Sequence, residues 1–268
     1  MSGPGMAGRD APPVRVEREG RVAILTLDRP ERRNALSLEL TLALTEALAA
    51  ADADATTGAI LLRGAGKDFC AGADIQEFTT YRGRSAPAVE AEGRALVELM
   101  RTAWRLRTPL VAEVHGHALG GGCGLVAMCH MAVAAADARL GTTEIRLGLF
   151  PLAILPAMVQ AVGPRRALEL GLTGRIFDAA EAERYGLVTE VTEPTALAPR
   201  ALAVAADLAA KSPVALALGL EGYRAAVSYG PGALDVENLL RVVSFLSDDL
   251  KEGAQAFLDR RPPEWRGR

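Results

Sequence analysis

The sequence has few cysteines, and their number and spacing exclude several kinds of site. Cys70, Cys123 and Cys129 are the only three among 268 residues, and they form neither a paired pattern nor a C-x-x-C motif. A disulfide framework and a cysteine-based metal site are therefore not expected. An odd number of unpaired thiols fits a reducing compartment, so we predict a cytoplasmic protein with no bound metal.

The sequence also lacks a strong excess of charge and any long apolar run. A formal net charge of −3 gives no support for a nucleic-acid-binding surface. No apolar stretch approaches the ~20 residues that a membrane-spanning helix needs, so we expect no membrane contact. Residues 1–13 are rich in Gly, Ala and Pro and lack the apolar core of a signal peptide, which predicts a disordered leader.

The rest of the sequence is organised in two parts. Strand-like and helix-like segments alternate over residues 14–194, which predicts an α/β core. Within it, the alternating pattern of Val14–Glu17 and Val22–Leu27 predicts an antiparallel pair, and Ser37 is a suitable cap for a helix that runs to Ala51. From residue 195 to residue 268 the pattern is helical, and its apolar stripes need a surface to pack against.

A run of glycines is the most informative part of the core. Three adjacent glycines, Gly120–Gly122, follow the apolar run Pro109–Val114 and precede a second one, Leu125–Met128. This order predicts a strand, a turn with an accessible backbone and the start of a helix. Free N–H groups and the positive end of a helix dipole would stabilise a negative charge there, including a transient oxyanion. The alternative is a tight turn packed against a neighbour without a ligand.

Two further segments have small or acidic residues beside probable strands. Gly64–Ile75 follows the apolar run Ala59–Leu62, and its small residues 71–73 leave main-chain amides accessible. Leu140–Pro151 carries one carboxylate, Glu144, among apolar and small residues. Taken alone, Glu144 also fits an ordinary solvated surface side chain.

Together these segments resemble the crotonase (enoyl-CoA hydratase/isomerase) superfamily. The resemblance extends over residues 14–268 and includes Arg29–Leu36 and the ending 252–263. It implies an α/β fold with a crotonase-like β/α spiral core over 14–194 and a C-terminal helical oligomerisation region over 195–268. It also implies a homotrimer or a dimer of trimers, an acyl-CoA thioester substrate, and no cofactor other than the CoA of that substrate.

The resemblance assigns roles to particular residues. Ala73 and Gly121 match the residues whose backbone N–H groups bind the thioester oxygen, and Glu144 matches a glutamate that exchanges protons with the substrate. Further positions match family residues that contact the substrate or its CoA, namely Arg32, Arg33, Ala35, Ala71, Asp74, Ile75, Phe257 and Arg260. The residues that match Phe257 and Arg260 often reach the nucleotide site of a neighbouring subunit. In members of that family, the region that matches Thr79–Ser85 covers the acyl pocket.

One departure from the family pattern affects the predicted reaction. Hydratases of the family usually carry a second glutamate at the position of Gly124. Water addition is easiest with one group that activates water and another that manages the proton at the α-carbon. A double-bond shift needs one carboxylate, so a lone Glu144 favours an isomerase-like proton shuttle, with hydration by Glu144 alone as an alternative.

Other side chains are candidates to replace the missing acid. Glu113 and His115 share one face of the predicted strand, and either reach the pocket or contact a neighbouring helix or subunit. His117 lies in the glycine turn and either lines the acyl pocket or packs beside the turn. The segment Phe150–Ile154 predicts bulky apolar pocket walls, without fixing the length or branching of the acyl chain.

Two other functions remain open from the sequence. A non-catalytic acyl-CoA-binding protein of the same fold would explain the loss of the second carboxylate. An NAD-dependent oxidoreductase is suggested by the G-x-G-x-x-A pattern of Gly122–Ala127, although Gly116–Gly121 separate that pattern from the preceding strand.

Overall fold

A six-stranded sheet forms the centre of the protein. The computed structural model describes residues 12–78 and 85–268, with only the backbone of residues 78, 91, 92 and 231. In spatial order the strands are β1 (Val14–Glu19), β2 (Val22–Leu27), β3 (Ala59–Gly64), β4 (Leu110–Val114), β6 (Met131–Ala135) and β9 (Glu190–Thr192). β1 and β2 are antiparallel and the other neighbours are parallel.

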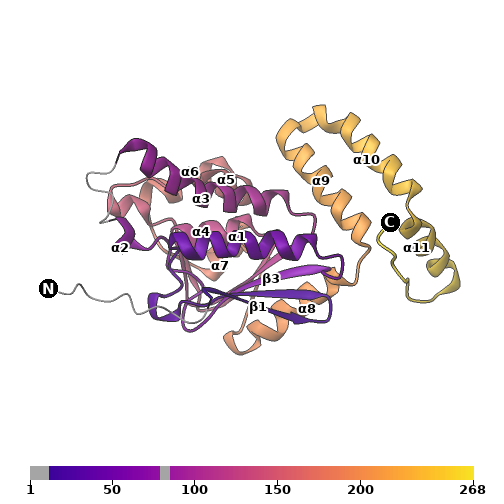
Figure 1. The fold of residues 1–268 in the computed structure, drawn as a ribbon, viewed down its shortest axis with the longest axis horizontal. Helices are drawn as coiled ribbons and strands as arrows, with labels where there is room; N and C mark the ends of the chain where they lie inside the picture. The colour runs from indigo at the N-terminus through magenta and orange to yellow at the C-terminus, as the bar shows by residue number, and fades with distance from the viewer. Residues whose placement is uncertain (1–11, 79–84) are drawn as a thin grey trace.

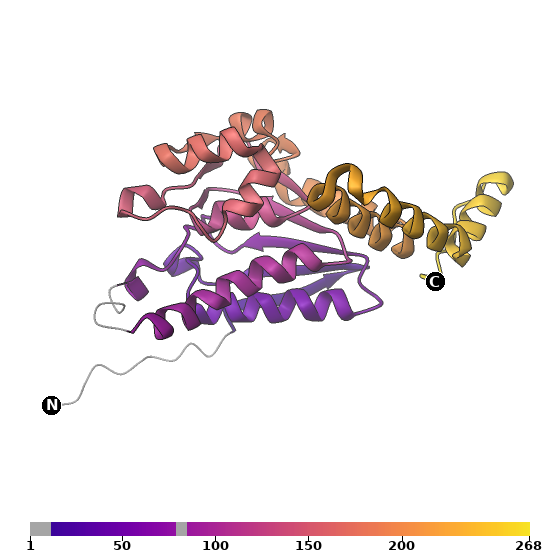
Figure 2. The same cartoon turned by 90° about the horizontal axis from the view of Figure 1, so that it is seen from above.

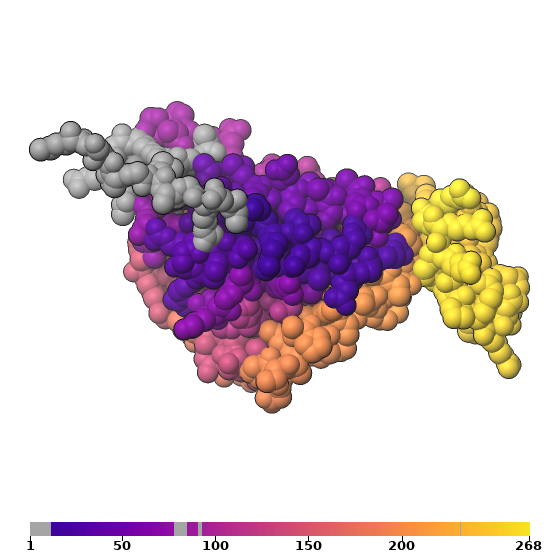
Figure 3. Space-filling model, turned by 60° about the horizontal axis from the view of Figure 1, so that its bottom comes forward, coloured from indigo at the N-terminus to yellow at the C-terminus, as the bar shows by residue number. Residues whose placement is uncertain are grey.

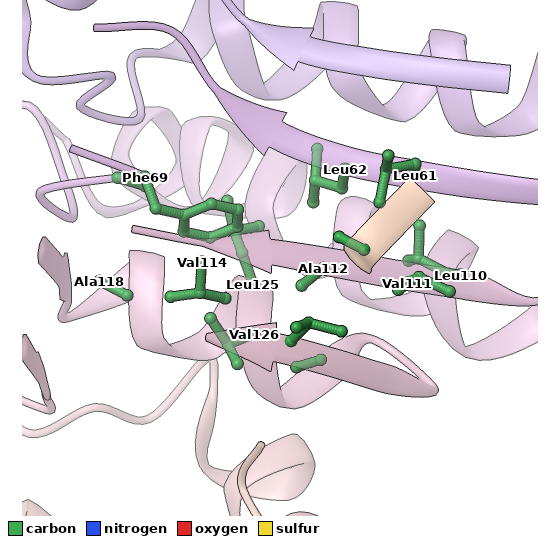
Figure 4. Close-up of a cluster of buried hydrophobic side chains, with 14 of the residues drawn as sticks. Leu61, Leu62, Phe69, Leu110, Val111, Ala112, Val114, Ala118, Leu125 and Val126 are labelled. Atoms are coloured by element: carbon green, nitrogen blue, oxygen red, sulfur yellow. The ribbon is translucent and has the colours of Figure 1, made fainter. Parts of the chain in front are cut away.

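Helices cover both faces of this sheet. All six residues of β2 are buried, which requires cover above and below, because alternate side chains point to opposite faces. α1 (Leu38–Ala53) packs on β1 and β2 beside α3 (Ala86–Arg105), and α8 (Leu197–Ala209) packs on β3, β4 and β6. Figure 4 shows the apolar side chains that fill the core between β3, β4 and the helix α4 (Gly121–Met128).

A smaller sheet lies next to α4. It contains β5 (His117–Leu119), β7 (Arg139–Gly141) and β8 (Phe177–Asp178), in that order. β5 is parallel to β7, and β7 is antiparallel to β8. The remaining helices of the body are α2 (Ile75–Phe78), α5 (Leu155–Val162), α6 (Pro164–Thr173) and α7 (Ala179–Tyr185), with short 3-10 turns at Pro30–Arg32, Glu144–Leu147 and Pro194–Ala196.

The C-terminal helices project from the body. We call α9 (Pro213–Tyr229), the 3-10 turn Gly230–Ala233, α10 (Leu234–Leu246) and α11 (Asp248–Asp259) the C-terminal arm. Figures 1 and 2 place the arm at one end of the molecule and α2 at the other, and Figure 3 shows the arm protruding beside the body. In the described residues no single helix is long and apolar enough to cross a membrane; only a pair bent by 100°, residues 194–209 with Pro213–Tyr229, meets the length and composition test together.

Several predicted elements are confirmed. The strand pair forms with an antiparallel register, and the amide of Leu40 donates to the Ser37 hydroxyl at 3.2 Å as α1 begins. Residues 1–11 of the predicted leader, and residues 79–84 of the predicted pocket cover, lie outside the described residues. The boundary at residue 194 stays a prediction, and α8, which follows it, packs on the sheet of the body.

Candidate active site

The loops 29–36 and 70–74 are joined edge to edge by backbone hydrogen bonds. The amide of Ala71 donates to Arg33 O at 3.0 Å, Leu36 N donates to Gly72 O at 2.7 Å, and Asp74 N donates to Leu36 O at 3.0 Å. This pairing brings the predicted CoA-binding positions of the two loops together. It also leaves the amide of Ala73, between two bonded residues, on the outer side of the pairing.

Asn34 holds this loop in shape, a role of its side chain that no local sequence pattern indicated. Its backbone is left-handed, with φ 54°, and its side chain is buried. The amide nitrogen Nδ2 donates to Ala65 O and Asp68 O at 2.8 Å each, while Oδ1 accepts from Arg29 N at 2.9 Å. Asparagine suits this position because it tolerates left-handed backbone and offers both donors and an acceptor.

The glycine turn approaches the 70–74 loop so closely that side chains would collide. A Cβ on Gly122 would lie 2.2 Å from Cys70 O, and a Cβ on Gly72 would lie 2.7 Å from Leu119 O. Gly120, immediately before α4, has φ 52° and ψ −123°, a conformation that is essentially restricted to glycine. The glycines therefore allow two backbone segments to pack in contact.

This contact places the first residue of α4, Gly121, close to the amide of Ala73. The position of a Cβ on Gly121 would be 4.0 Å from Ala73 N and 2.9 Å from Leu36 Cδ1. In the described part of the chain, neither amide donates to a protein acceptor. Two free donors at a helix N-terminus suit an oxygen that gains negative charge.

Glu144 lies beside the same turn. Its carboxylate faces Gly120, where a Cβ would be 3.3 Å from Oε1. Oε2 is buried and has no hydrogen-bond partner among the described residues. Burial raises the pKa of the Glu144 carboxyl above its ordinary value. The arrangement gives a proton acceptor of increased basicity next to two free amides.

Gly124 occupies the predicted position of the missing acid, and its surroundings are apolar. A Cβ there would lie 2.2 Å from Ile154 Cγ2 and 2.6 Å from Ile154 Cβ. Ile154 is 2% exposed and precedes α5. This isoleucine is the specific apolar group that the bulky segment 150–154 contributes next to α4.

Over the described ranges of the chain, none of the three proposed substitutes makes a hydrogen bond or ion pair with Gly124 or Glu144. Glu113 lies opposite Arg63 in the register of β3 with β4, and its Oε2 is buried without a partner in the described residues. His115 Nε2 lies 3.1 Å from Gly66 O. His117 Nδ1 lies 2.6 Å from Asp68 Oδ1. The two histidines thus contact the loop that carries Gly66 and Asp68, and a catalytic role for any of the three residues stays a hypothesis.

Asp68 links His117 to Arg33. Besides the contact with His117 Nδ1, Asp68 Oδ1 accepts from His117 N at 3.0 Å, and Oδ2 accepts from Arg33 Nε at 2.7 Å. Burial by itself raises the pKa of Asp68, but hydrogen bonds from Arg33 and His117 outweigh it and bring the pKa down to about 2. This pair of contacts fixes the loop that carries Arg33.

The other predicted contact residues divide into two groups. Arg32 is exposed and bonds Gln76, and Ile75 is 56% exposed, so both present side chains to solvent at the loop edge. Asp74 is buried, pairs with Arg29 at 3.1 Å and accepts from Gln76 N in the first turn of α2. Ala35 is buried, and its carbonyl accepts from Arg29 Nη1 at 2.6 Å. Asp74 and Ala35 thus shape the loops through Arg29.

Phe257 and Arg260 lie far from these loops. Both belong to the end of α11, at the opposite end of the molecule from α2 (Figure 1). The Phe257 side chain is 83% exposed. Within one chain the structure does not bring them to the site; their predicted contact with a neighbouring subunit stays a prediction.

The dinucleotide pattern of residues 122–127 is not in a strand-to-helix turn. Gly122 and Gly124 lie inside α4, after its first residue. A dinucleotide fingerprint needs its glycines in the turn where the pyrophosphate meets the helix N-terminus. The structure therefore gives no support to the oxidoreductase alternative.

Comparison with known proteins gives a consistent assignment. The family model for enoyl-CoA hydratase/isomerase matches residues 17–268. A probable enoyl-CoA hydratase of Rhizobium meliloti is 38% identical over 255 residues, which cover 94% of this chain and 97% of that protein. The mevalonyl-coenzyme A hydratase of Aspergillus fumigatus is 32% identical over 251 residues, or 91% of each.

Solved structures agree with the sequence matches. The enoyl-CoA hydratase of Mycobacterium smegmatis superimposes with a TM-score of 0.89 at 35% identity, covering 95% of this chain and 99% of that one. The enoyl-CoA hydratase of Bacillus anthracis gives 0.89 at 32% identity, covering 96% and 100%. With this fold, and with the predicted motifs meeting around Gly121, the chain belongs to the enoyl-CoA hydratase/isomerase family of the crotonase superfamily.

Proposed function

We propose that the protein shifts the double bond of an enoyl-CoA thioester, with Glu144 as the proton carrier. The carboxylate of Glu144 removes a proton from C2 of a 3-enoyl-CoA, and the electron pair moves toward the thioester oxygen to give a dienolate. The protonated Glu144 then returns the proton to C4, and the double bond ends between C2 and C3. The observation that carries this proposal is a half-buried carboxylate whose Oε2 has no partner among the described residues, near the free amides of Ala73 and Gly121, with no acid at position 124.

The amides of Ala73 and Gly121 would stabilise the dienolate. The thioester oxygen gains negative charge only as the proton leaves C2, so donors fixed in advance lower the barrier more than they tighten substrate binding. Loss of one such donor typically costs about 3–4 kcal/mol of transition-state stabilisation. Both donors are backbone groups, which explains why the positions around them are small.

The loop edge formed by residues 29–36 and 71–76 would hold the CoA. In this proposal Arg32 and Arg33 meet the phosphates, since guanidinium groups suit phosphate oxygens, and Ala71 and Ile75 line the channel for adenine and pantetheine. Ala35 and Asp74 keep the two loops in register through Arg29. No metal or redox cofactor is required, because the reaction only moves a proton.

The C-terminal arm would mediate assembly into a homotrimer or a dimer of trimers. Many large apolar side chains of the arm are exposed in the single chain, and such surfaces mark sites of protein–protein contact. The largest exposed fractions are those of Tyr229, Leu234, Leu239, Phe245, Leu246, Phe257 and Leu258. In such an assembly Phe257 and Arg260 would reach the CoA of a neighbour. Light scattering of the purified protein tests this, with a monomer as the opposing result.

The principal alternative is a non-catalytic acyl-CoA-binding protein. Gly124, which has no titratable side chain, is the observation in its favour. Against it, Glu144 is retained in a position that raises its pKa, and a site that only binds gains nothing from a carboxylate oxygen that is buried without a partner.

One experiment separates these functions. The protein is incubated with 2-enoyl- and 3-enoyl-CoA of several chain lengths in deuterated buffer, and bond migration, hydration and deuterium entry at C2 are followed. We expect migration and exchange, both reduced about 10²–10⁴-fold in Glu144→Gln with binding retained. Binding without any turnover would favour the non-catalytic alternative, and full activity of Glu144→Gln would refute the role of Glu144.

A further inference from the structure

Ile154 fills the space into which a side chain at position 124 would project. Its Cγ2 and Cβ lie 2.2 Å and 2.6 Å from the position of a Cβ on Gly124. These separations are far below a normal contact, so the isoleucine and any larger residue at 124 exclude each other. The absence of an acid at 124 is therefore coupled to the presence of a branched apolar residue on another helix.

The isoleucine cannot easily move away. Ile154 is 2% exposed, and its carbonyl accepts from Met158 N at 3.0 Å as α5 begins. Met158 is itself 1% exposed, and its Sδ lies 3.9 Å from Cys123 Sγ on α4. The packing of α5 against α4 thus holds Ile154 against Gly124.

Ile154 and Glu144 lie against two glycines of the same segment. Gly124 N donates to Gly120 O at 3.1 Å, so the two glycines are joined by the first backbone hydrogen bond at the start of α4. Glu144 faces the first glycine and Ile154 faces the second. Ile154 therefore occupies the place where the side chain of a second acid on α4 would begin.

This arrangement disfavours the binding of a reactive water molecule but leaves proton transfer by Glu144 possible. A bound water needs two to four polar partners, and the Ile154 side supplies none. Hydration must add the oxygen of water to C3 and a proton to C2. A double-bond shift adds no atoms and needs only the carboxylate of Glu144.

We propose that Ile154 determines reaction specificity by excluding both a second acid and an activated water from the site. The favoured substrates are then CoA thioesters of 3-enoic acids, which are isomerised and not hydrated. This inference rests on the proposed role of Glu144 as proton carrier. Ile154 acts through the space that it occupies and takes no part in the bond changes.

The test is to exchange the isoleucine for an acid on α4. The double variant Gly124→Glu with Ile154→Gly is required, because the Cβ of an alanine at 154 would still collide with the new side chain. Hydration of a 2-enoyl-CoA is compared with bond migration of the matching 3-enoyl-CoA in the wild type, the double variant, Ile154→Gly and Ile154→Val. Circular dichroism and CoA-ester binding confirm that each variant is folded.

We expect hydration by the double variant to exceed that of the wild type by at least about 10²-fold, the usual contribution of one general acid–base group. Ile154→Val should keep the wild-type ratio of the two activities, since it retains a branched apolar group. A folded double variant that binds the ester and hydrates no faster than Ile154→Gly would overturn the inference. So would a wild type that hydrates as fast as it isomerises.

A second variant covers the case in which the double variant does not fold. Ile154→Glu brings a carboxylate from α5 into the same volume without altering Gly124, and it should also gain hydration. The two proposals fail separately. A wild type without isomerisation or C2 exchange refutes the function proposed for Glu144, whereas a wild type that isomerises beside folded acid variants that do not hydrate refutes the role of Ile154 alone.

Discussion

The Glu144 carboxylate faces Gly120, and a side chain at position 120 would crowd it. A Cβ at position 120 would lie 3.3 Å from Oε1 and 3.7 Å from Oε2 of the carboxylate. The residue after Gly120 provides one of the two free amides of the site. The acid and the amide are therefore positioned by the same turn, and a change in that turn moves both.

Gly120→Ala should for this reason abolish most activity. The new methyl group would displace the carboxylate, and the φ of 52° with ψ of −123° would strain any residue with a Cβ by about 1–3 kcal/mol. We expect bond migration to fall by about 10²-fold or more. Gly148→Ala is the matched control, since its φ is also positive, at 78°, but a Cβ there meets open space. Equal losses of activity in the two variants would contradict the argument.

The pH dependence of kcat/KM should report the environment of Glu144. Burial raises the pKa of this carboxyl, and the reaction needs its deprotonated form. We expect activity to increase with pH along a single limb whose midpoint lies above the ordinary glutamate value of 4.5. Initial rates with a 3-enoyl-CoA at subsaturating concentration measure it. A midpoint at or below that value would mean that Glu144 is solvated or is not the base.

Local patterns predicted the elements and the loops, because each depends on neighbours in the sequence. The cap at Ser37, the strand pair and the glycine loops around Ala73 and Gly121 are of this kind. The relationship of Ile154 to Gly124 was not predictable, since it depends on how α5 packs against α4. The sequence indicated only that residues 150–154 are bulky.

Asp68 shows the same limit for charged groups. No local pattern indicated that Asp68 would join His117 to Arg33, because Asp68 is 49 positions from His117 and 35 positions from Arg33. The contact depends on the arrangement of loops that follow two different strands. Likewise, no local pattern indicated that Asp74 would be buried and paired with Arg29, and its predicted contact with the substrate stays a prediction.

Asp68→Asn should destabilise the protein at neutral pH. The pKa of Asp68 falls from 3.8 to about 2 on folding, so its ionised form stabilises the folded state above about pH 4, and this contribution is lost as the pH falls through about 2. With allowance for the half-exposed Arg33 side chain, we expect a loss of about 1–2 kcal/mol at pH 7. Urea unfolding of both proteins at pH 7 and in strong acid measures this loss in the free energy of unfolding. A difference that persists unchanged in acid would exclude this ionisation as the cause.

Glu113→Gln should have the opposite effect on stability. Burial raises the pKa of Glu113, so ionisation destabilises the folded state, and wild-type stability is lost as the pH rises above the ordinary glutamate value. The neutral glutamine avoids this cost. We expect the variant to be as stable as the wild type near about pH 4 and more stable near about pH 8, by about 1 kcal/mol. Thermal unfolding across this pH range measures the difference in stability between the two proteins. A wild type whose stability increases relative to that of the variant as the pH rises would contradict this prediction.

Asp249→Ala should loosen the C-terminal arm without reaching the catalytic turn. The carboxylate is 2% exposed and accepts from Ser212 Oγ at 2.7 Å, Arg266 N at 2.7 Å and Gly267 N at 3.0 Å. It thus ties α11 and the C-terminal residues to the start of α9. Alanine would leave these donors unpaired, at about 1–3 kcal/mol for each that water does not reach.

Hydrogen exchange should therefore increase in α9 and α11 of Asp249→Ala and remain unchanged in α1. Asp248→Ala is the matched control, because the neighbouring carboxylate is exposed and its ion pairs with Lys251 and Arg268 are of the kind that contributes little. If the arm mediates assembly, Asp249→Ala should also lower the mass measured by light scattering. The kinetics of bond migration by Asp249→Ala show whether the neighbouring subunit completes the CoA site. If a neighbour's Phe257 and Arg260 complete it, the variant should have a higher KM than the wild type and a similar kcat. If the site is complete within one chain, both constants should stay at their wild-type values.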